Sequence, residues 1–349
     1  MFNKKTIYVI LCIIFLLVLG SPAIACSSFA VYSDSVLYGM NFDQPDVKIN
    51  YAITDFDDLK VFHMDFEVFG NLTPIVGMNN KGLFAAIQMQ YPEQPITDKL
   101  KDNQIDMHDF GMSMLMYNSV NDIDNYIKDK VVVNHYLSCH DLFADKTGNA
   151  MVVEAGEKNN LISKIQDKFI IMTNFSNYNL KTNSYRDIFE AGSDRYATAY
   201  EYITKNKDNF KLANAIEVLK DTAQENATSP TLSSMVFDPE NQEIYIVIKR
   251  NFEKIWKVSL ENKTIEGYKG FKTPIRLKLD DKGILMDTLQ KYTMENDAKE
   301  LETISKATKS DNITTENSKF NYYLVVGVLV FALASIFILR KIFNTRKSV

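Results

Sequence analysis

The chain has 349 residues, of which 46% are hydrophobic and 24% charged, so it is long enough to bury a core in one large domain. Its formal net charge is −5, and acidic and basic residues alternate along the middle without a basic patch of the kind that binds nucleic acid. Composition and charge therefore exclude nucleic acid as a partner.

The first 25 residues have the order of a secretory signal peptide. Two lysines precede an apolar run at 7–19, and small residues, Ala23 and Ala25, occupy positions −3 and −1 before Cys26. An uncleaved anchor is the alternative, but Pro22 beside the small residues favours cleavage. We expect a signal peptide at 1–25 and a mature chain that begins with cysteine.

The other end of the chain predicts a membrane anchor. The segment 321–340 is uncharged up to its last residue and long enough to span a bilayer, although a buried core helix is the alternative. The basic tail at 341–349 would stay in the cytoplasm. Residues 295–320 are expected to form a partly helical or disordered stalk. We therefore predict a single-pass cell-membrane protein that contacts the lipid bilayer and has an extracellular domain at 26–294.

This domain predicts an α+β fold. Two β-rich segments separated by a short turn open it as a hairpin, and hairpins with helices inserted between them favour a layered sandwich. Strands are expected at 27–33, 36–41, 51–54, 60–68, 73–78, 82–90, 130–136, 151–154, 161–165, 168–172, 233–237, 243–249 and 255–259. Helices are expected at 109–118, 119–127, 193–204 and 212–224.

Cysteine usage draws attention to the predicted mature N-terminus. Of the three cysteines, Cys12 leaves with the signal, which leaves Cys26 and Cys139. A disulfide between these two is one alternative, but disulfide-stapled secreted domains are usually small and richer in cysteine. We favour a free thiol at Cys26.

An N-terminal cysteine carries its own base. A free α-amine has a pKa of about 7.7–8.0, so near neutral pH a useful fraction can accept the thiol proton. The same amine can then return the proton to the leaving nitrogen of an amide. Nucleophile and base thus share one residue.

Six segments resemble the choloylglycine hydrolase and penicillin V acylase family of N-terminal nucleophile hydrolases. They are CSSF at 26–29, YGMNFD at 38–43, NNKGL at 79–83, the stretch from 140 to 154, MTNF at 172–175 and SDRY at 193–196. Their order and rough spacing agree over residues 26–270. The resemblance implies a four-layer αββα sandwich, an amidase that cleaves linear carbon–nitrogen bonds, and no metal or organic cofactor.

The resemblance also assigns roles to five residues. It makes Cys26 the nucleophile and base, Asp43 the carboxylate that holds the α-amine, and Arg195 a residue that orients both. It makes Asn174 a donor to the oxyanion and Gln90 a second donor. Singly, an Asp, Asn or Arg in these contexts is usually a turn, cap or surface ion-pair residue. Their order behind a terminal cysteine favours catalysis.

The sequence departs from the family pattern at Met40, where bile salt hydrolases carry arginine. This removes a charge near the thiol and makes conjugated bile salts less certain as substrates. The resemblance implies small N-acyl compounds: conjugated bile acids, phenoxyacetyl-type penicillins, N-acyl homoserine lactones or N-acyl amines. An acyltransferase, a homo-oligomer and Gln88 as the second oxyanion donor stay open.

Two rival readings use the same cysteines differently. A lipoprotein processing site at Cys26 would block the amine and thiol with lipid and leave a membrane-tethered binding protein. The second rival is a Cys/His hydrolase built on Cys139 with His135 or His140, but neighbouring residues of a strand point to opposite faces. The same three residues form too small a set for a metal site.

Overall fold

The computed structural model describes residues 26–297, apart from residues 95, 98, 112–116, 136, 226 and 227. The chain divides into two compact units, Met1–Asp297 and Ala298–Val349, and the second lies outside the described residues. So do the predicted signal peptide at 1–25, the membrane segment at 321–340, the tail at 341–349 and nearly all of the stalk at 295–320. In the described part of the chain, no helix is long and apolar enough to cross a membrane.

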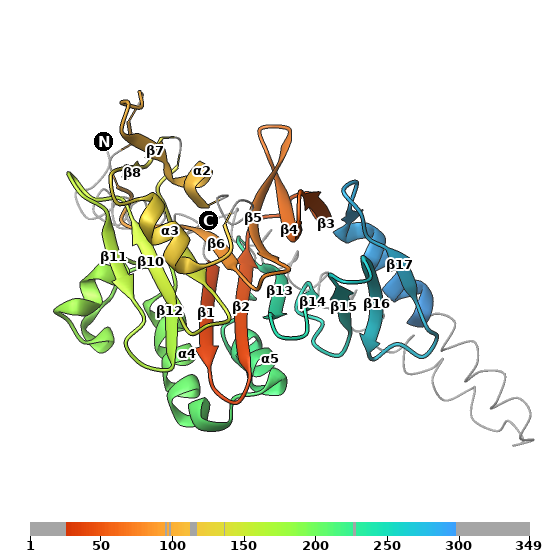
Figure 1. Cartoon of the computed structure of the whole chain (residues 1–349). Helices are drawn as coiled ribbons and strands as arrows, with labels where there is room; N and C mark the ends of the chain where they lie inside the picture. Colours follow the sequence, from red (N-terminus) through yellow and green to blue (C-terminus); the bar gives the residue numbers. More distant parts are fainter. Residues whose placement is uncertain are drawn as a thin grey trace, which may run out of the picture. The chain divides into compact units, whose positions relative to one another are not determined.

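Two antiparallel sheets form the centre of the domain (Figure 1). Within the described residues, the first sheet has the order β12 (Phe169–Met172), β1 (Cys26–Tyr32), β2 (Val36–Asp43), β13 (Thr231–Asp238), β14 (Glu243–Ile248), β15 (Ile255–Ser259), β16 (Thr264–Lys269), β17 (Arg276–Lys278). The second has the order β11 (Leu161–Lys164), β10 (Ala150–Glu154), β9 (Cys139–Ala144), β6 (Phe84–Met89), β5 (Asn71–Asn79), β4 (Leu59–Val68), β3 (Ile49–Phe56), β18 (Ile284–Leu285). A short parallel pair, β7 (Gln104–Asp106) and β8 (Val131–Val133), lies apart from both sheets.

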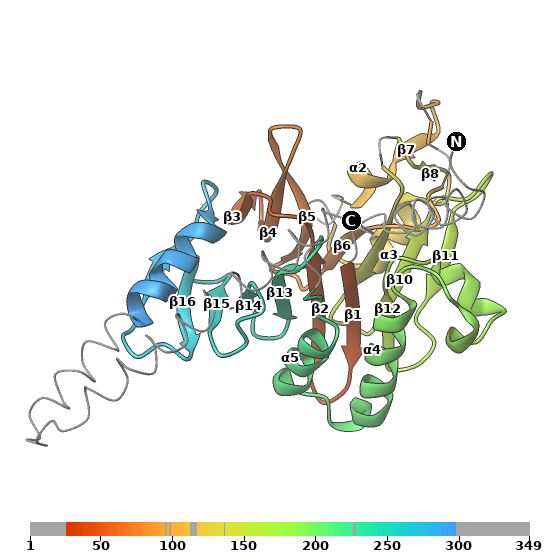
Figure 2. The ribbon, with the colours of Figure 1, turned by 180° about the vertical axis from the view of Figure 1, so that it is seen from behind.

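Helices cover the outer face of each sheet. The first sheet packs on α4 (Ser193–Asn206) and α5 (Leu212–Asp221), which Figure 2 shows beside β1 and β2. The second packs on α2 (Met107–Gly111) and α3 (Val120–Tyr126). These layers confirm the predicted α+β sandwich. Within the described residues, the other helices are the 3₁₀ turns η2 (Asn177–Lys181), η3 (Tyr185–Asp187) and η4 (Lys207–Asn209), and a helix at 286–297.

Strand β1 is buried on both of its faces. Because side chains alternate along a strand, Cys26 and Ala30 join the core between the two sheets, whereas Phe29 and Val31 join the core under α4 and α5. The predicted opening hairpin is confirmed, since β1 pairs with β2 over its whole length. This alternation directs the side chain of Cys26, the first residue of β1, into the space between the two sheets.

Several elements differ from the sequence prediction. Strand β9 was not expected, because His and Asp interrupt its apolar pattern although the whole strand is buried. The expected strand at 130–136 is reduced to Val131–Val133, and the expected helix at 109–118 begins earlier, as Met107–Gly111, before residues outside the described part. The strands after residue 260 and the helix at 286–297 were also missed.

The packing of Gly39 gives a test of the first sheet. Gly39 lies opposite Phe29, and a Cβ atom at this glycine would lie 2.3 Å from Phe29 Cζ. We expect Gly39→Ala to destabilise the fold by about 1–3 kcal/mol, because the ring must leave its place in a close-packed core. Urea unfolding measures this loss. Asp34→Ala, at the exposed turn of the same hairpin, is the control, and equal stability of both variants would contradict the packing.

Candidate active site

Cys26 begins β1 and is almost fully buried, with 2% of its surface exposed. Its backbone nitrogen donates a hydrogen bond to Asn174 Oδ1 at 3.0 Å. In the full-length chain this nitrogen belongs to a peptide bond, and release of residues 1–25 would turn it into an α-amine. The partner of that amine is therefore in place before any cleavage.

Arg195 joins the residues of the site. One guanidinium nitrogen donates to the carbonyl oxygen of Cys26 and, at 2.7 Å, to Ser27 Oγ. The other donates to Asn174 Oδ1 at 2.6 Å. Asp43 Oδ2 lies 3.7 Å from the first nitrogen, Nη1. Arg195 is only 6% exposed, so this charge is compensated by neighbours and not by water. Four of the five residues assigned from the sequence thus meet here.

A glycine in the left-handed region allows the start of α4 to lie close to Asn174. Gly192 precedes α4 with φ +82°. A Cβ atom there would lie 2.8 Å from an Arg195 guanidinium nitrogen and 3.0 Å from the Asn174 backbone nitrogen. The conformation and the crowding both favour glycine.

Asp43 lies beside the guanidinium and not at the Cys26 nitrogen. Its carboxylate accepts hydrogen bonds from Thr231 Oγ1 at 2.5 Å and Gln224 Nε2 at 2.8 Å. Burial raises the pKa of Asp43 to about 6, although Arg195 and the two donors oppose the rise. In the full-length chain the Cys26 nitrogen bonds Asn174, and the role of Asp43 toward the released α-amine stays a prediction.

The thiol of Cys26 is neutral near pH 7. Burial and then the Asp43 carboxylate raise its pKa to about 12, while the backbone N–H of Asp43 and the charge of Arg195 act in the opposite direction. A neutral thiol is a weak nucleophile, so this site requires a base that removes the proton.

The side chain of Asn174 has a defined orientation. Arg195 can only donate, so the atom it contacts is Oδ1, and Nδ2 donates to the carbonyl of Met89 at 2.7 Å. The Asn174 carbonyl accepts the N–H of Tyr91 at 2.5 Å. The segment after β12 is thereby fixed to the end of β6.

The structure does not bring Gln90 to the thiol. Its Nε2 donates to Glu154 at 3.0 Å, and Gln88, the alternative, donates to Ser28 Oγ at 2.8 Å. The oxyanion role assigned to Gln90 thus stays a prediction that no contact among the described residues supports. The sequence identifies Glu154 only as the end of the stretch from 140 to 154 that resembles the family and assigns it no role, because a single buried acid leaves no spacing signal.

The described contacts of Cys139 and His140 do not pair these two residues as the rival hydrolase on the second cysteine requires. Cys26 and Cys139 are both free thiols. Cys139 contacts Met89 Sδ at 3.9 Å, and burial raises the pKa of its thiol. The ring of His140 contacts Glu154 and the Thr173 carbonyl instead.

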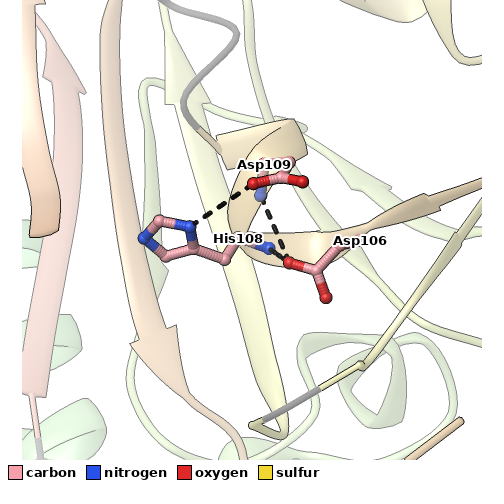
Figure 3. A group of neighbouring side chains, drawn as sticks. All are labelled: Asp106, His108 and Asp109. Carbon is pink, nitrogen blue, oxygen red and sulfur yellow. Dashed lines mark hydrogen bonds and ion pairs between the residues drawn. The ribbon is translucent and has the colours of Figure 1, made fainter. Parts of the chain in front are cut away.

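A group of acidic residues and a histidine at the start of α2 is a helix cap (Figure 3). Asp106 Oδ1 accepts the backbone N–H groups of His108 at 3.0 Å and Asp109 at 3.4 Å, and Oδ2 accepts that of His135. His108 Nε2 lies 3.2 Å from the Pro74 carbonyl. These contacts hold α2 in place.

The two antiparallel sheets and their helix layers form a fold of the N-terminal nucleophile hydrolase type. The family model of acyl-coenzyme A:6-aminopenicillanic acid acyl-transferase matches residues 34–253, and the chain belongs to this family. The family resemblance predicted from the sequence is confirmed.

Solved structures agree with this fold. A variant of conjugated bile acid hydrolase from Clostridium perfringens is similar at a TM-score of 0.54 and 17% identity, covering 71% of this chain and 98% of that chain. Penicillin V acylase from Agrobacterium tumefaciens is similar at a TM-score of 0.53 and 14% identity, covering 69% and 90%. A comparison with curated proteins gives no significant match.

The raised pKa of Asp43 predicts a pH-dependent stability. Because the pKa rises from 3.8 to about 6 on folding, the stability contribution is fully present below about pH 4 and is lost as the pH rises through 6. The loss amounts to about 3 kcal/mol. Urea unfolding of the wild type and of Asp43→Asn at about pH 4 and pH 7 isolates this contribution. The pH dependence due to all other ionisable groups is common to both proteins and cancels in the difference. Identical pH dependence in both proteins would contradict the raised pKa.

Proposed function

We propose that the protein hydrolyses linear amide bonds in small N-acyl compounds, with Cys26 as nucleophile once residues 1–25 are removed. The observation that carries this proposal is the convergence of the Cys26 nitrogen and Arg195 on Asn174 Oδ1. That contact fixes the future α-amine beside its own thiol. The buried, neutral thiol gives this amine its task, because the site needs a base.

The proposed reaction has two steps. The α-amine accepts the thiol proton while Cys26 Sγ attacks the carbonyl carbon of the amide. The carbon–nitrogen bond then breaks, the amine returns the proton to the leaving nitrogen, and a thioester remains on Cys26. Water attacks this thioester and transfers a proton to the amine. The carboxylic acid leaves and the thiol regains its proton.

The oxyanion of each tetrahedral intermediate is assigned to the side-chain amide of Asn174. This follows the family resemblance. The atom of Asn174 that contacts Cys26 is the acceptor Oδ1, so donation to the oxyanion falls to Nδ2, which carries two hydrogens and gives one of them to the Met89 carbonyl. One such donor contributes about 10²–10³ in rate, because it acts on charge as it develops. Arg195 holds the acceptor end of the same amide and so orients the donor end.

The substrate class is proposed from the family. The structural relatives act on conjugated bile acids and penicillin V by their names, which supports an N-acyl amide with an apolar acyl group. Met40 is fully buried in the core between the sheets. It takes the place of a charged residue, so we expect a preference for acyl groups that do not need that charge.

Acyl transfer to an amine is the second candidate function. It uses the same thioester, with an amine in place of water, and the name of the matching family model favours it. Adding an amine acceptor to the assay separates the two reactions. Product that remains the free acid at high acceptor concentration indicates a hydrolase, and a new amide indicates a transferase.

The proposed mechanism requires an unmodified N-terminal cysteine. We propose that the enzyme is exported and anchored by residues 321–340, with its domain outside the cell. Intact mass and N-terminal sequencing of the exported protein are expected to show a chain that begins at free Cys26. A lipid-modified Cys26, or a chain that keeps residues 1–25, would contradict the catalytic proposal and favour the binding-protein alternative.

Substitution of the two cysteines tests the nucleophile. Cys26→Ala is expected to lower amide hydrolysis by at least about 10³-fold with the fold intact, because no thioester can form. Cys139→Ala, which removes the other buried thiol, should keep activity within about threefold. A panel of N-acyl amides with amine detection measures both rates. Activity retained by Cys26→Ala would exclude the mechanism.

A further inference from the structure

Another buried acidic residue, next to the segment that carries Asn174, lies on the hairpin of β9 and β10. Glu154 ends β10, His140 lies opposite it on β9, and neither side chain has exposed surface. We propose that Glu154 and His140 are positioning residues that hold Asn174 by fixing both ends of the segment 173–178. The kinetic part of this inference rests on the proposed function.

The pair contacts the segment on both sides of Asn174. Before it, the Thr173 carbonyl lies 2.6 Å from His140 Nε2 and accepts its hydrogen. After it, the Glu154 carboxylate accepts the backbone N–H of Asn177 at 3.0 Å and of Tyr178 at 2.9 Å. Ser176 Oγ donates to the same carboxylate at 3.2 Å. The backbone is thus hydrogen-bonded to this pair on both sides of Asn174.

Hydrogen bonding couples His140 and Glu154 to each other. His140 Nδ1 lies 3.4 Å from Glu154 Oε1, and its Nε2 bonds the Thr173 carbonyl at 2.6 Å. The imidazole ring therefore joins the carboxylate that holds residues 176–178 to the backbone just before Asn174.

The same carboxylate holds the strand on the other side of Asn174. Gln90 Nε2 donates to Glu154, and the neighbouring residues Met89 and Tyr91 bond the side chain and the carbonyl of Asn174. Glu154 therefore fixes the loop that carries Asn174 and the strand end against which it rests. The side chain of Gln90 thus takes part in holding Asn174 through Glu154.

A buried carboxylate at the opposite end of the same hairpin provides the matched control. Asp145, 1% exposed, follows β9 and accepts hydrogen bonds from Val120 N at 2.9 Å, Thr147 N at 2.9 Å and the Asn149 side chain at 3.4 Å. It has the same chemistry as Glu154 but no contact with the segment 173–178. Loss of stability alone should affect both positions.

Two readouts on the full chain compare Glu154→Gln with Asp145→Asn. Hydrogen exchange followed by mass spectrometry is expected to show at least about tenfold faster exchange of residues 173–178 in Glu154→Gln only. In steady-state kinetics we expect kcat to fall about 10–100-fold with KM within about threefold, because a displaced oxyanion donor affects the transition state and not binding. Asp145→Asn should leave both kcat and the exchange of 173–178 unchanged.

Milder variants keep the test decisive if Glu154→Gln does not fold. Ser176→Ala removes one donor to the Glu154 carboxylate. His140→Gln replaces the imidazole ring by an amide, which can keep only one of the two contacts of the ring. Both should accelerate exchange at 173–178 and lower kcat by less than Glu154→Gln. Exchange and kcat that match those of Asp145→Asn would overturn the positioning role. A wild type without amide activity would instead overturn the proposed function, and exchange alone would then decide the positioning role.

Discussion

The site depends on one buried guanidinium. Arg195 cannot lose its charge and is nearly inaccessible to water, so its donors must find protein acceptors. The acceptors come from β1, from the segment after β12 and, at longer range, from the end of β2. Segments that are far apart in the sequence are therefore fixed to each other by a single side chain from α4. Catalytic geometry follows from this requirement of charge burial.

Strand β1 supports this arrangement through its alternation. Ser27 faces the helices and accepts a hydrogen bond from Arg195, whereas Ser28 faces the second sheet and accepts one from Gln88. Alternation puts the thiol of Cys26 on the same face as Ser28, in the core between the two sheets. Small hydroxyl side chains suit a strand buried on both faces, because each needs only one partner and leaves room for the residues that provide it.

Sequence reasoning found the residues whose order carries information. The opening hairpin and the motifs around Asp43, Asn174 and Arg195 follow from turn chemistry and family resemblance, and the structure brings these residues together with Cys26. Strand alternation indicates only which face a side chain occupies and not which neighbour it bonds. The family resemblance places a second oxyanion donor in the strand after Gly82 but does not give the neighbour of each side chain, and Gln90 bonds Glu154. The stretch from 140 to 154 resembles the family, but the contact between its two ends follows from strand pairing, which no short motif encodes.

The core between the sheets is aromatic at one end and polar at the other. At the end away from Cys26, the rings of Tyr38, Phe84, Phe237 and Phe62 form a chain of contacts with centroids 4.9–6.0 Å apart: one stacked, one tilted and one edge-to-face. At the Cys26 end, the same core holds carboxylate, imidazole and amide groups that cost free energy to bury unless they are bonded. The aromatic end supplies stability that the polar end lacks. A site of this polarity therefore requires the large sandwich in which it lies.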